Sequence, residues 1–249
     1  MPDGLKKFAL SERDSSLVLI DGKSGWHKNT QTLEYDREIL CAECDQKIGK
    51  FEDAFQIFIR DFLDHPDRNK NENQRISVSC DSNRIVLAVL SILLKYSFSK
   101  RYPDIQLGSK YEHIISNAVR INTLPSEYGR QIQIVALGSN SHIVSKDGEE
   151  RDLSKVGRAQ MMGGRSRSYH TYFMEPPGTW FVIKVGNTNW DPIASNGAVL
   201  KDSKFITVNT APFDKTILYK DIMSGTFKRN QWIEQRSRNR RERHNSSKK

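Results

Sequence analysis

Long apolar runs are missing from this sequence of 249 residues. The most apolar stretch, Ile85 to Leu94, has about half of the roughly 20 residues that a membrane-spanning helix needs. It contains Ser91, and Arg84 and Lys95 flank it. The N-terminus, MPDGLKKFALSERD, lacks the apolar core of a secretion signal. We therefore expect a cytoplasmic protein without a membrane segment, in which the apolar stretch forms a buried helix.

Cysteine is scarce as well, with only Cys41, Cys44 and Cys80. An odd, small number gives no disulfide framework and fits a reducing compartment. Phosphate loops are absent, because GSNS at 138–141 and the later MMGGRS lack the glycine and lysine spacing that holds a nucleotide. No serine stands in a nucleophile motif. The sequence therefore favours neither a disulfide scaffold, nor a nucleotide-binding enzyme, nor a serine hydrolase.

The positive charge is concentrated at the C-terminal end. The net charge is +9, and residues 228–249 hold nine basic residues against two acidic ones, a net +7 that leaves +2 for the rest. Such a tail is typical of polyanion binding, although a solubilising end has the same composition. We expect a basic, disordered tail that contacts nucleic acid through arginines, namely Arg236, Arg238, Arg240, Arg241 and Arg243.

Helical periodicity marks the first half of the chain. An aromatic and aliphatic stripe predicts a helix that ends near His65: Phe51, Phe55, Phe58, Ile59 and Phe62. The polar segment 67–75 predicts a loop. Asp81 or Ser82 is expected to cap a second, central helix. Ser109 and Glu112 have capping-box spacing, which predicts a third helix to about residue 121.

Strand-like segments follow after Gly129. QIQIVAL, TWFVIKVG, KFITVN and TILYKDI are short, rich in β-branched and aromatic residues, and separated by turn formers. The expected fold class is therefore α+β. We expect helices in 1–124 and an antiparallel sheet in 125–227, forming one compact body, with the basic tail at 228–249.

The CAEC segment, Cys41 to Cys44, has the spacing that lets two thiolates from one turn bind a zinc ion. A tetrahedral site needs four ligands. The sequence offers three possible further ligands, none of them in a second closely spaced pair: Cys80, His27 and His65. Two cysteines packed where a loop enters a helix explain the pattern equally well. We expect no cofactor, with zinc at this weak half site as the alternative.

At these residues the chain resembles a known family. DREILCAECDQKIGKFEDAF, followed by RIVLAVLSILLKYSFSKRYPDIQLGSKYEHII, is similar to the core of bacterial and phage HNH-related proteins of the treble-clef type. The resemblance rests on a leucine-cysteine knuckle, an aromatic helix with a glutamate, and an apolar serine-isoleucine-leucine helix, and it covers roughly residues 1–120. It implies a treble-clef-like N-terminal segment and a phage or prophage setting.

One departure from that family bears on catalysis. In such proteins a first CxxC knuckle and a catalytic histidine precede an apolar-proline step, which Met1-Pro2 matches here. Either the true start lies upstream, or the scaffold has lost its active site. A nuclease would need a base and metal ligands, for which the remaining candidates are His27, Asp45, Glu52, Asp53 and His65.

A second nucleic-acid candidate lies at GRAQMMGGRSRSYHTYF, residues 157–173. Arginines neutralise phosphates, glycines allow close approach, and aromatic rings stack on unpaired bases. We expect contacts from Arg158, Arg165, Arg167 and Tyr169. An equally good interpretation of the aromatic pair that follows, Tyr172 and Phe173, is a strand whose rings face the core.

These observations together predict a binding protein and favour no catalytic activity. The expected partner is single-stranded DNA or a DNA–protein complex, and the resemblance adds interference with replication or defence complexes, for instance through a single-strand-binding protein. The alternative is a metal-dependent HNH-like endonuclease. A plain protein-interaction module is the third hypothesis, and it predicts no retention on DNA at moderate salt.

Overall fold

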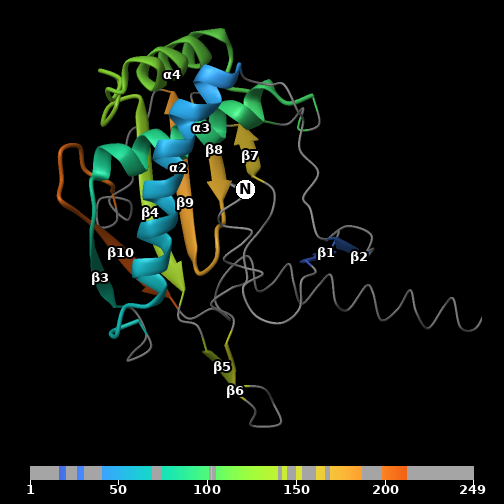
Figure 1. Cartoon of the computed structure of the whole chain (residues 1–249), viewed down its shortest axis with the longest axis vertical. Helices are drawn as coiled ribbons and strands as arrows, with labels where there is room; N and C mark the ends of the chain where they lie inside the picture. Colours follow the sequence, from blue (N-terminus) through green and yellow to red (C-terminus); the bar gives the residue numbers. More distant parts are fainter. Residues whose placement is uncertain are drawn as a thin grey trace, which may run out of the picture.

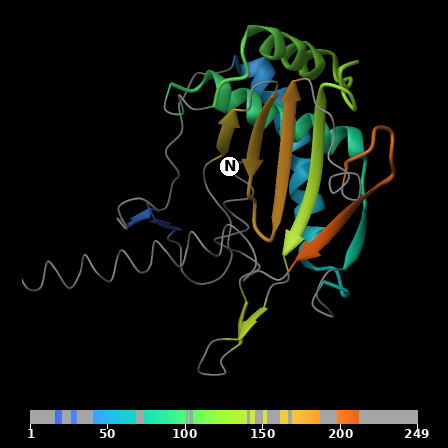
Figure 2. The same cartoon turned by 180° about the vertical axis from the view of Figure 1, so that it is seen from behind.

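A computed structural model shows a six-stranded sheet with helices packed against one face (Figures 1 and 2). It describes residues 17–20, 27–30, 41–68, 74–100, 102, 105–139, 142–144, 150–152, 161–165, 169–186 and 198–211. The basic tail, the segment TILYKDI, Arg158 and Arg167 lie outside these residues. The fold is mixed α+β, as the sequence predicts.

Three helices lie in the described residues, and their bounds follow the apolar stripes. They are α2 (Ala42–Leu63), α3 (Ser82–Phe98) and α4 (Ser109–Ile121). The predicted stripe of α2 is buried along its whole length, and every side chain of α3 from Ile85 to Leu94 is buried. The expected central helix is therefore confirmed. No helix in the described part of the chain is long and apolar enough to span a membrane.

The sheet has the strand order β3-β10-β4-β9-β8-β7. Its strands are β3 (Arg75–Ser79), β4 (Ile132–Ser139), β7 (Met162–Arg165), β8 (Tyr169–Met174), β9 (Thr179–Gly186) and β10 (Phe205–Ala211). Two further hairpins pair β1 (Leu17–Ile20) with β2 (His27–Thr30), and β5 (His142–Val144) with β6 (Glu150–Asp152).

The sheet differs from the predicted one in two respects. It is antiparallel except between β10 and β4, where Asn209 pairs with Leu137 in parallel register. It also takes one edge strand, β3, from the helical half, so the expected loop at 67–75 ends where that strand begins. Only Ile76 and Val78 of β3 are buried, and two apolar positions in a polar context give a weak strand pattern.

The core lies between α2, α3 and the inner face of the sheet. Phe181 of β9 contacts Phe55 and Phe58 of α2 at ring-centroid distances of 5.1 and 6.1 Å, both edge-on. Gly138 of β4 passes so close to Phe62 and Val208 that a Cβ there would meet both side chains. The absence of a side chain at residue 138 is thus required by the packing of α2 on the sheet.

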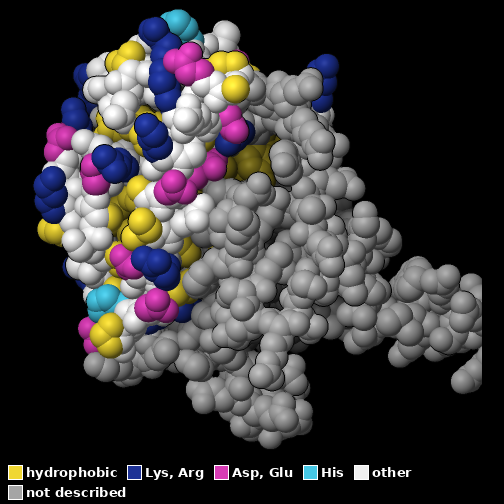
Figure 3. All heavy atoms as spheres, viewed as in Figure 1, with side chains coloured by type: hydrophobic (Ala, Val, Ile, Leu, Met, Phe, Trp, Pro, Cys, Tyr) yellow, Lys and Arg dark blue, Asp and Glu magenta, His cyan; other side chains and the backbone are white. Residues whose placement is uncertain are grey.

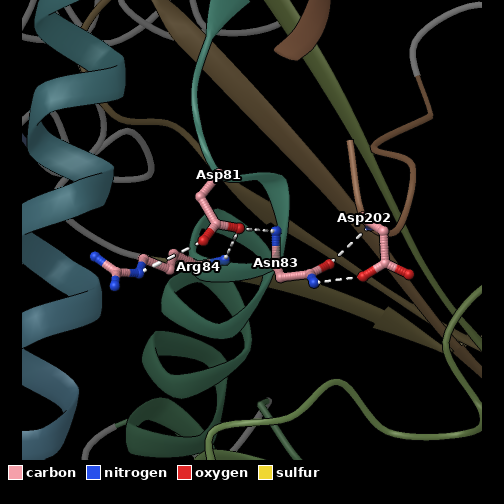
Figure 4. A network of polar contacts seen from close by, with 4 residues as sticks. All are labelled: Asp81, Asn83, Arg84 and Asp202. Carbon is pink, nitrogen blue, oxygen red and sulfur yellow. Dashed lines mark hydrogen bonds and ion pairs between the residues drawn. The ribbon is translucent and has the colours of Figure 1, made fainter. Parts of the chain in front are cut away.

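A polar network joins the start of α3 to the turn before β10 (Figure 4). Asp81 caps the helix by accepting from the backbone N–H groups of Asn83 and Arg84. The Asn83 side chain donates to Asp202 Oδ1 at 2.7 Å and accepts from the Asp202 backbone N–H at 3.0 Å. Asp202 adopts a left-handed conformation with φ 57°. The network connects the start of α3 with the turn before β10.

The predicted capping box of α4 is wrong. The N-cap is Gly108, whose φ of 77° favours glycine, and no side chain caps the helix. Glu112 instead accepts a hydrogen bond from Ser97 Oγ at 2.7 Å, and the Leu107 backbone N–H donates to the same Ser97 oxygen. A tertiary contact between α3 and α4 therefore takes the glutamate that the local pattern assigned to a cap.

Candidate functional site

The outer face of the sheet is the face that no described helix covers (Figure 2). Alternation along β9 places Phe181 and Ile183 in the core and Trp180, Val182 and Lys184 on this outer face, where all three are partly exposed. The helices thus leave one apolar and aromatic strand face available for contacts.

Two aromatic residues occupy neighbouring register positions on this face. Phe173 of β8 pairs directly with Val182 of β9, which places it diagonally next to Trp180, two residues along the same strand. Diagonal neighbours on one sheet face lie within reach of aromatic rings. The row through Trp180 continues across the sheet by register to Leu137, Asn209 and Arg75. A basic residue at the far edge therefore lies in line with the aromatic pair.

The outer face is not uniformly open. Its central positions on β4, Gln133 and Val135, are 8% and 4% exposed, and the Gln133 amide donates to the Gly129 carbonyl at 2.9 Å. Phe205 on β10 is 54% exposed, and Arg75 on the neighbouring strand is exposed as well. Accessible side chains are therefore found around a closed centre.

The hairpin of β7 and β8 brings two of the predicted nucleic-acid residues together. Arg165 pairs with His170, and Tyr169 pairs with Gly186 of β9, so both backbone positions lie at the same end of the hairpin. Arg158, Arg167, Arg236, Arg238, Arg240, Arg241 and Arg243 lie outside the described residues. The structure thus brings two of the predicted contact residues together and places none of the others.

Tyr172 and Phe173, for which the sequence left two interpretations open, lie on opposite faces of β8. Tyr172 is 1% exposed and donates its hydroxyl hydrogen to the Gln106 carbonyl at 2.6 Å. It is a core residue, and burial raises its pKa to about 12. Phe173 lies on the outer face and is partly exposed. Sequence reasoning missed its neighbour Trp180, although the alternation in TWFVIKVG placed Trp180 and Phe181 on opposite faces.

Among the described residues on the helix-covered side, the charges of both signs are mixed. Figure 3 shows basic and acidic side chains interspersed over the described residues on this side. Glu43 and Lys47 of α2 form an ion pair at 2.9 Å, and Arg84 Nε lies 3.6 Å from Asp81 Oδ2. Mixed charges of this kind give no extended positive field for phosphates.

The cysteine pair lies where the chain enters α2. Cys41 is the N-cap, with extended backbone (φ −69°, ψ 157°), and its Sγ accepts from the Cys44 backbone N–H at 3.4 Å. Hydrogen bonds from the Cys44 backbone and side chain lower the pKa of Cys41. The side-chain hydrogen bond to Cys41 and burial raise the pKa of Cys44. Both thiols are free, and Cys41 is exposed.

The candidate nuclease carboxylates occupy structural contacts. Lys95 Nζ lies 2.9 Å from Glu52 Oε1 and 3.3 Å from Asp45 Oδ1, which ties α3 to α2. Asp53 is exposed, and His65 Nδ1 accepts from the Asp67 backbone N–H at 3.2 Å. Glu52 lies roughly 16 Å along the helix axis from Leu63, the last helical residue, at 1.5 Å per residue, and His65 follows after the helix has ended.

A buried arginine at the end of α2 also has a structural explanation. Arg68 is 1% exposed, lies 5.2 Å from the centroid of the Phe62 ring and donates to the Leu63 carbonyl at 3.4 Å. Gly178, with φ 65°, passes so close that a Cβ would lie 2.6 Å from the guanidinium. These contacts fix the turn after α2 against the turn before β9.

Within the described ranges, no group of three or more histidine, cysteine or acidic side chains could hold a metal ion. Comparisons of the chain with protein-family models, curated proteins and solved structures found no match. The HNH-related resemblance and the treble-clef arrangement therefore stay predictions.

Proposed function

We propose that this protein binds single-stranded nucleic acid along the outer face of its sheet, without catalysis. The observation that carries the proposal is the aromatic pair formed by Phe173 and Trp180 on adjacent strands of the face that the described helices leave uncovered. Bases of single strands stack on such rings whatever their sequence. Flat sheet faces with two or three aromatic residues are a recurrent platform for unpaired bases.

Charge around the aromatic pair supports the same proposal. The row through Trp180 ends at Arg75, an exposed basic residue on the edge strand. A basic residue on the same face as stacking rings can neutralise a phosphate that connects the stacked bases. The net +7 of residues 228–249 adds a sequence-independent attraction for the same polyanion. Double-stranded DNA offers no unpaired bases to the rings and is expected to bind more weakly.

The DNA–protein complex stays part of the proposal as the natural setting of a single strand in a cell. A protein that occupies single strands, or their coating protein, would interfere with replication or with defence complexes. This part rests on the resemblance to phage and bacterial HNH-related proteins alone. A pull-down of a single-strand-binding protein with and without nuclease treatment separates a protein contact from a DNA bridge.

The test compares two aromatic variants with a matched control. Trp180→Ala and Phe173→Ala should each weaken binding to a fluorescent oligothymidylate by about 1–3 kcal/mol, measured by anisotropy at fixed salt. The control is Ile57→Ala on α2, where the side chain is 49% exposed on the helix-covered side and the affinity should not change. Equal affinities of all four proteins would refute binding at this face.

A further inference from the structure

We propose that Cys41 and Cys44 form a redox-active dithiol, which cycles between two free thiols and an intramolecular disulfide. The pair lies in the first turn of a helix of 22 residues, with both thiols free and Cys41 exposed. The proposal is independent of nucleic-acid binding, because it concerns the opposite layer of the fold, the start of α2.

The geometry of the pair brings the two side chains within reach of a disulfide after a small shift. Residues three apart on a helix have Cβ atoms about 5–6 Å apart, and a disulfide requires Cβ atoms about 3.5–4.5 Å apart, so the N-cap residue has to move by roughly 1–2 Å. The extended backbone of Cys41 (φ −69°, ψ 157°) turns its sulfur back over the helix end, where it accepts from the Cys44 N–H at 3.4 Å.

The two sulfurs have different chemical roles. Cys41 is exposed, and its Sγ accepts from the Cys44 backbone N–H at the positive end of the helix dipole, which favours a thiolate at that position. Cys44 is partly buried. Cys41 is therefore the attacking thiolate, and Cys44 is the thiol that resolves the intermediate.

The third cysteine is unsuited to either role. Cys80 lies at the end of β3, and burial, the largest cause, raises its pKa to about 11. Its thiol is therefore protonated at neutral pH and reacts slowly. Cys80 serves as an internal reference for the reactivity of the pair.

The oxidant is a low-molecular-weight disulfide, RSSR. The Cys41 thiolate attacks one sulfur of RSSR, the S–S bond breaks, and RS⁻ leaves, so that Cys41 forms a mixed disulfide with RS. Cys44 then loses its proton to solvent and attacks the Cys41 sulfur, and the second RS⁻ leaves. Each RS⁻ then takes up one proton from solvent, and one of these two protons balances the proton that Cys44 released. The dithiol is oxidised by two electrons, and RSSR is reduced to two RSH.

The test uses the full chain equilibrated in buffers of oxidised and reduced glutathione, then quenched with an alkylating reagent and analysed by peptide mass spectrometry. In the oxidised buffers we expect both alkylation sites at Cys41 and Cys44 to be lost together, with one disulfide between them. Cys80 should stay alkylatable after denaturation. Cys44→Ser should accumulate glutathione on Cys41, whereas Cys41→Ser should give neither product. Cys80→Ser is the matched control and should behave as the wild type.

Two results would overturn the proposal. One is independent glutathionylation of Cys41 and Cys44 without a disulfide between them. The other is stoichiometric zinc in the purified protein that protects both thiols from alkylation until a chelator removes it, because the pair would then be part of a metal centre. Nucleic-acid binding by Cys41→Ser does not bear on the redox chemistry of the pair, so either proposal can fail without the other.

Discussion

Asn83 and Asp202 exchange two hydrogen bonds across 119 positions of sequence, at 2.7 and 3.0 Å. Asn83 lies in the first turn of the central helix, α3, and Asp202 lies in the turn before β10 (Figure 4). Adjacent to it, Ser82 Oγ accepts from the Ser203 backbone N–H at 2.9 Å. The closure of the fold therefore depends on a polar contact at the surface as well as on its apolar core.

Replacement of Asn83 by alanine is expected to lower the free energy of unfolding by about 1–2 kcal/mol, because two hydrogen bonds are lost at a partly exposed position. Urea unfolding followed by circular dichroism measures this change. Asn117→Ala is the control, since Asn117 is exposed on α4 and bonds only to Arg120 among the contacts found for it. Equal losses in both variants would show that the contact with Asp202 contributes nothing.

Two glycines should respond in opposite ways to alanine. At Gly138 the added methyl group would meet Phe62 and lie 2.9 Å from Val208 Cγ1, so we expect a loss of about 1–3 kcal/mol from overpacking. At Gly49, inside α2, nothing lies within 4 Å of the new Cβ, and a gain of about 0.5–1 kcal/mol in helix propensity should follow. Thermal unfolding of both variants checks the signs. A stabilised Gly138→Ala protein would contradict the described packing of α2 on β4.

Alkaline pH should destabilise the protein through Cys80. Burial, the largest cause, raises its pKa from 9.0 to about 11 in the folded state. The unfolded chain therefore loses this proton first as the pH rises. The contribution is fully present below about pH 9 and is lost as the pH rises from about 9 to 11.

The measurement compares urea unfolding at about pH 8 and about pH 11 for the wild type and Cys80→Ala. We expect the variant to lose less stability between these two values. Tyr172 adds a further decrease between about pH 10 and 12, because its pKa is raised from 10.0 to about 12. An identical pH dependence in the variant and the wild type would mean that Cys80 does not titrate with a raised pKa.

Deletion of residues 236–249 tests the expected role of the basic end. The segment holds no apolar residue, so the melting temperature of the body should stay unchanged. Each lost phosphate contact should reduce the slope of log affinity against log salt by about 0.7 on single strands. Alanine at both Arg165 and Arg167 should weaken binding even with the tail present. An unchanged slope after the deletion would leave the tail as a solubility feature.

The helices were predictable because burial and period agree in them. Two patterns are each compatible with a helix and with no other secondary structure. They are the phenylalanine stripe from Phe51 to Phe62 and the continuous apolar run of α3. Strand β3 was missed because RISVS follows a long polar segment and buries only two side chains. The parallel pairing of β10 with β4 could not be predicted either, since register between distant strands is set by the completed core and not by either strand alone.

The sequence predicted only the part of the candidate site that depends on local pattern. Arg165 and Tyr169 lie close in sequence, so the hairpin that joins them follows from local pattern. Trp180 was missed because both alternating sets of TWFVIKVG are largely apolar, and the pattern alone does not say which set faces the helices. The thiol contact at Cys41 depends on the helix end, whose first residue the sequence located only approximately.

The position of β10 between β3 and β4 has a consequence for biosynthesis. In the described sheet β3 has β10 as its only neighbour, and Ser77 pairs with Thr207 across 130 positions. A nascent chain on the ribosome therefore carries β3 without a partner until β10, which ends at Ala211, has been synthesised. Products truncated before residue 205 would expose two strand edges and are expected to be aggregation-prone substrates for chaperones and proteases. A protein shortened by an early stop codon is therefore expected to be removed by quality control and not to retain partial activity.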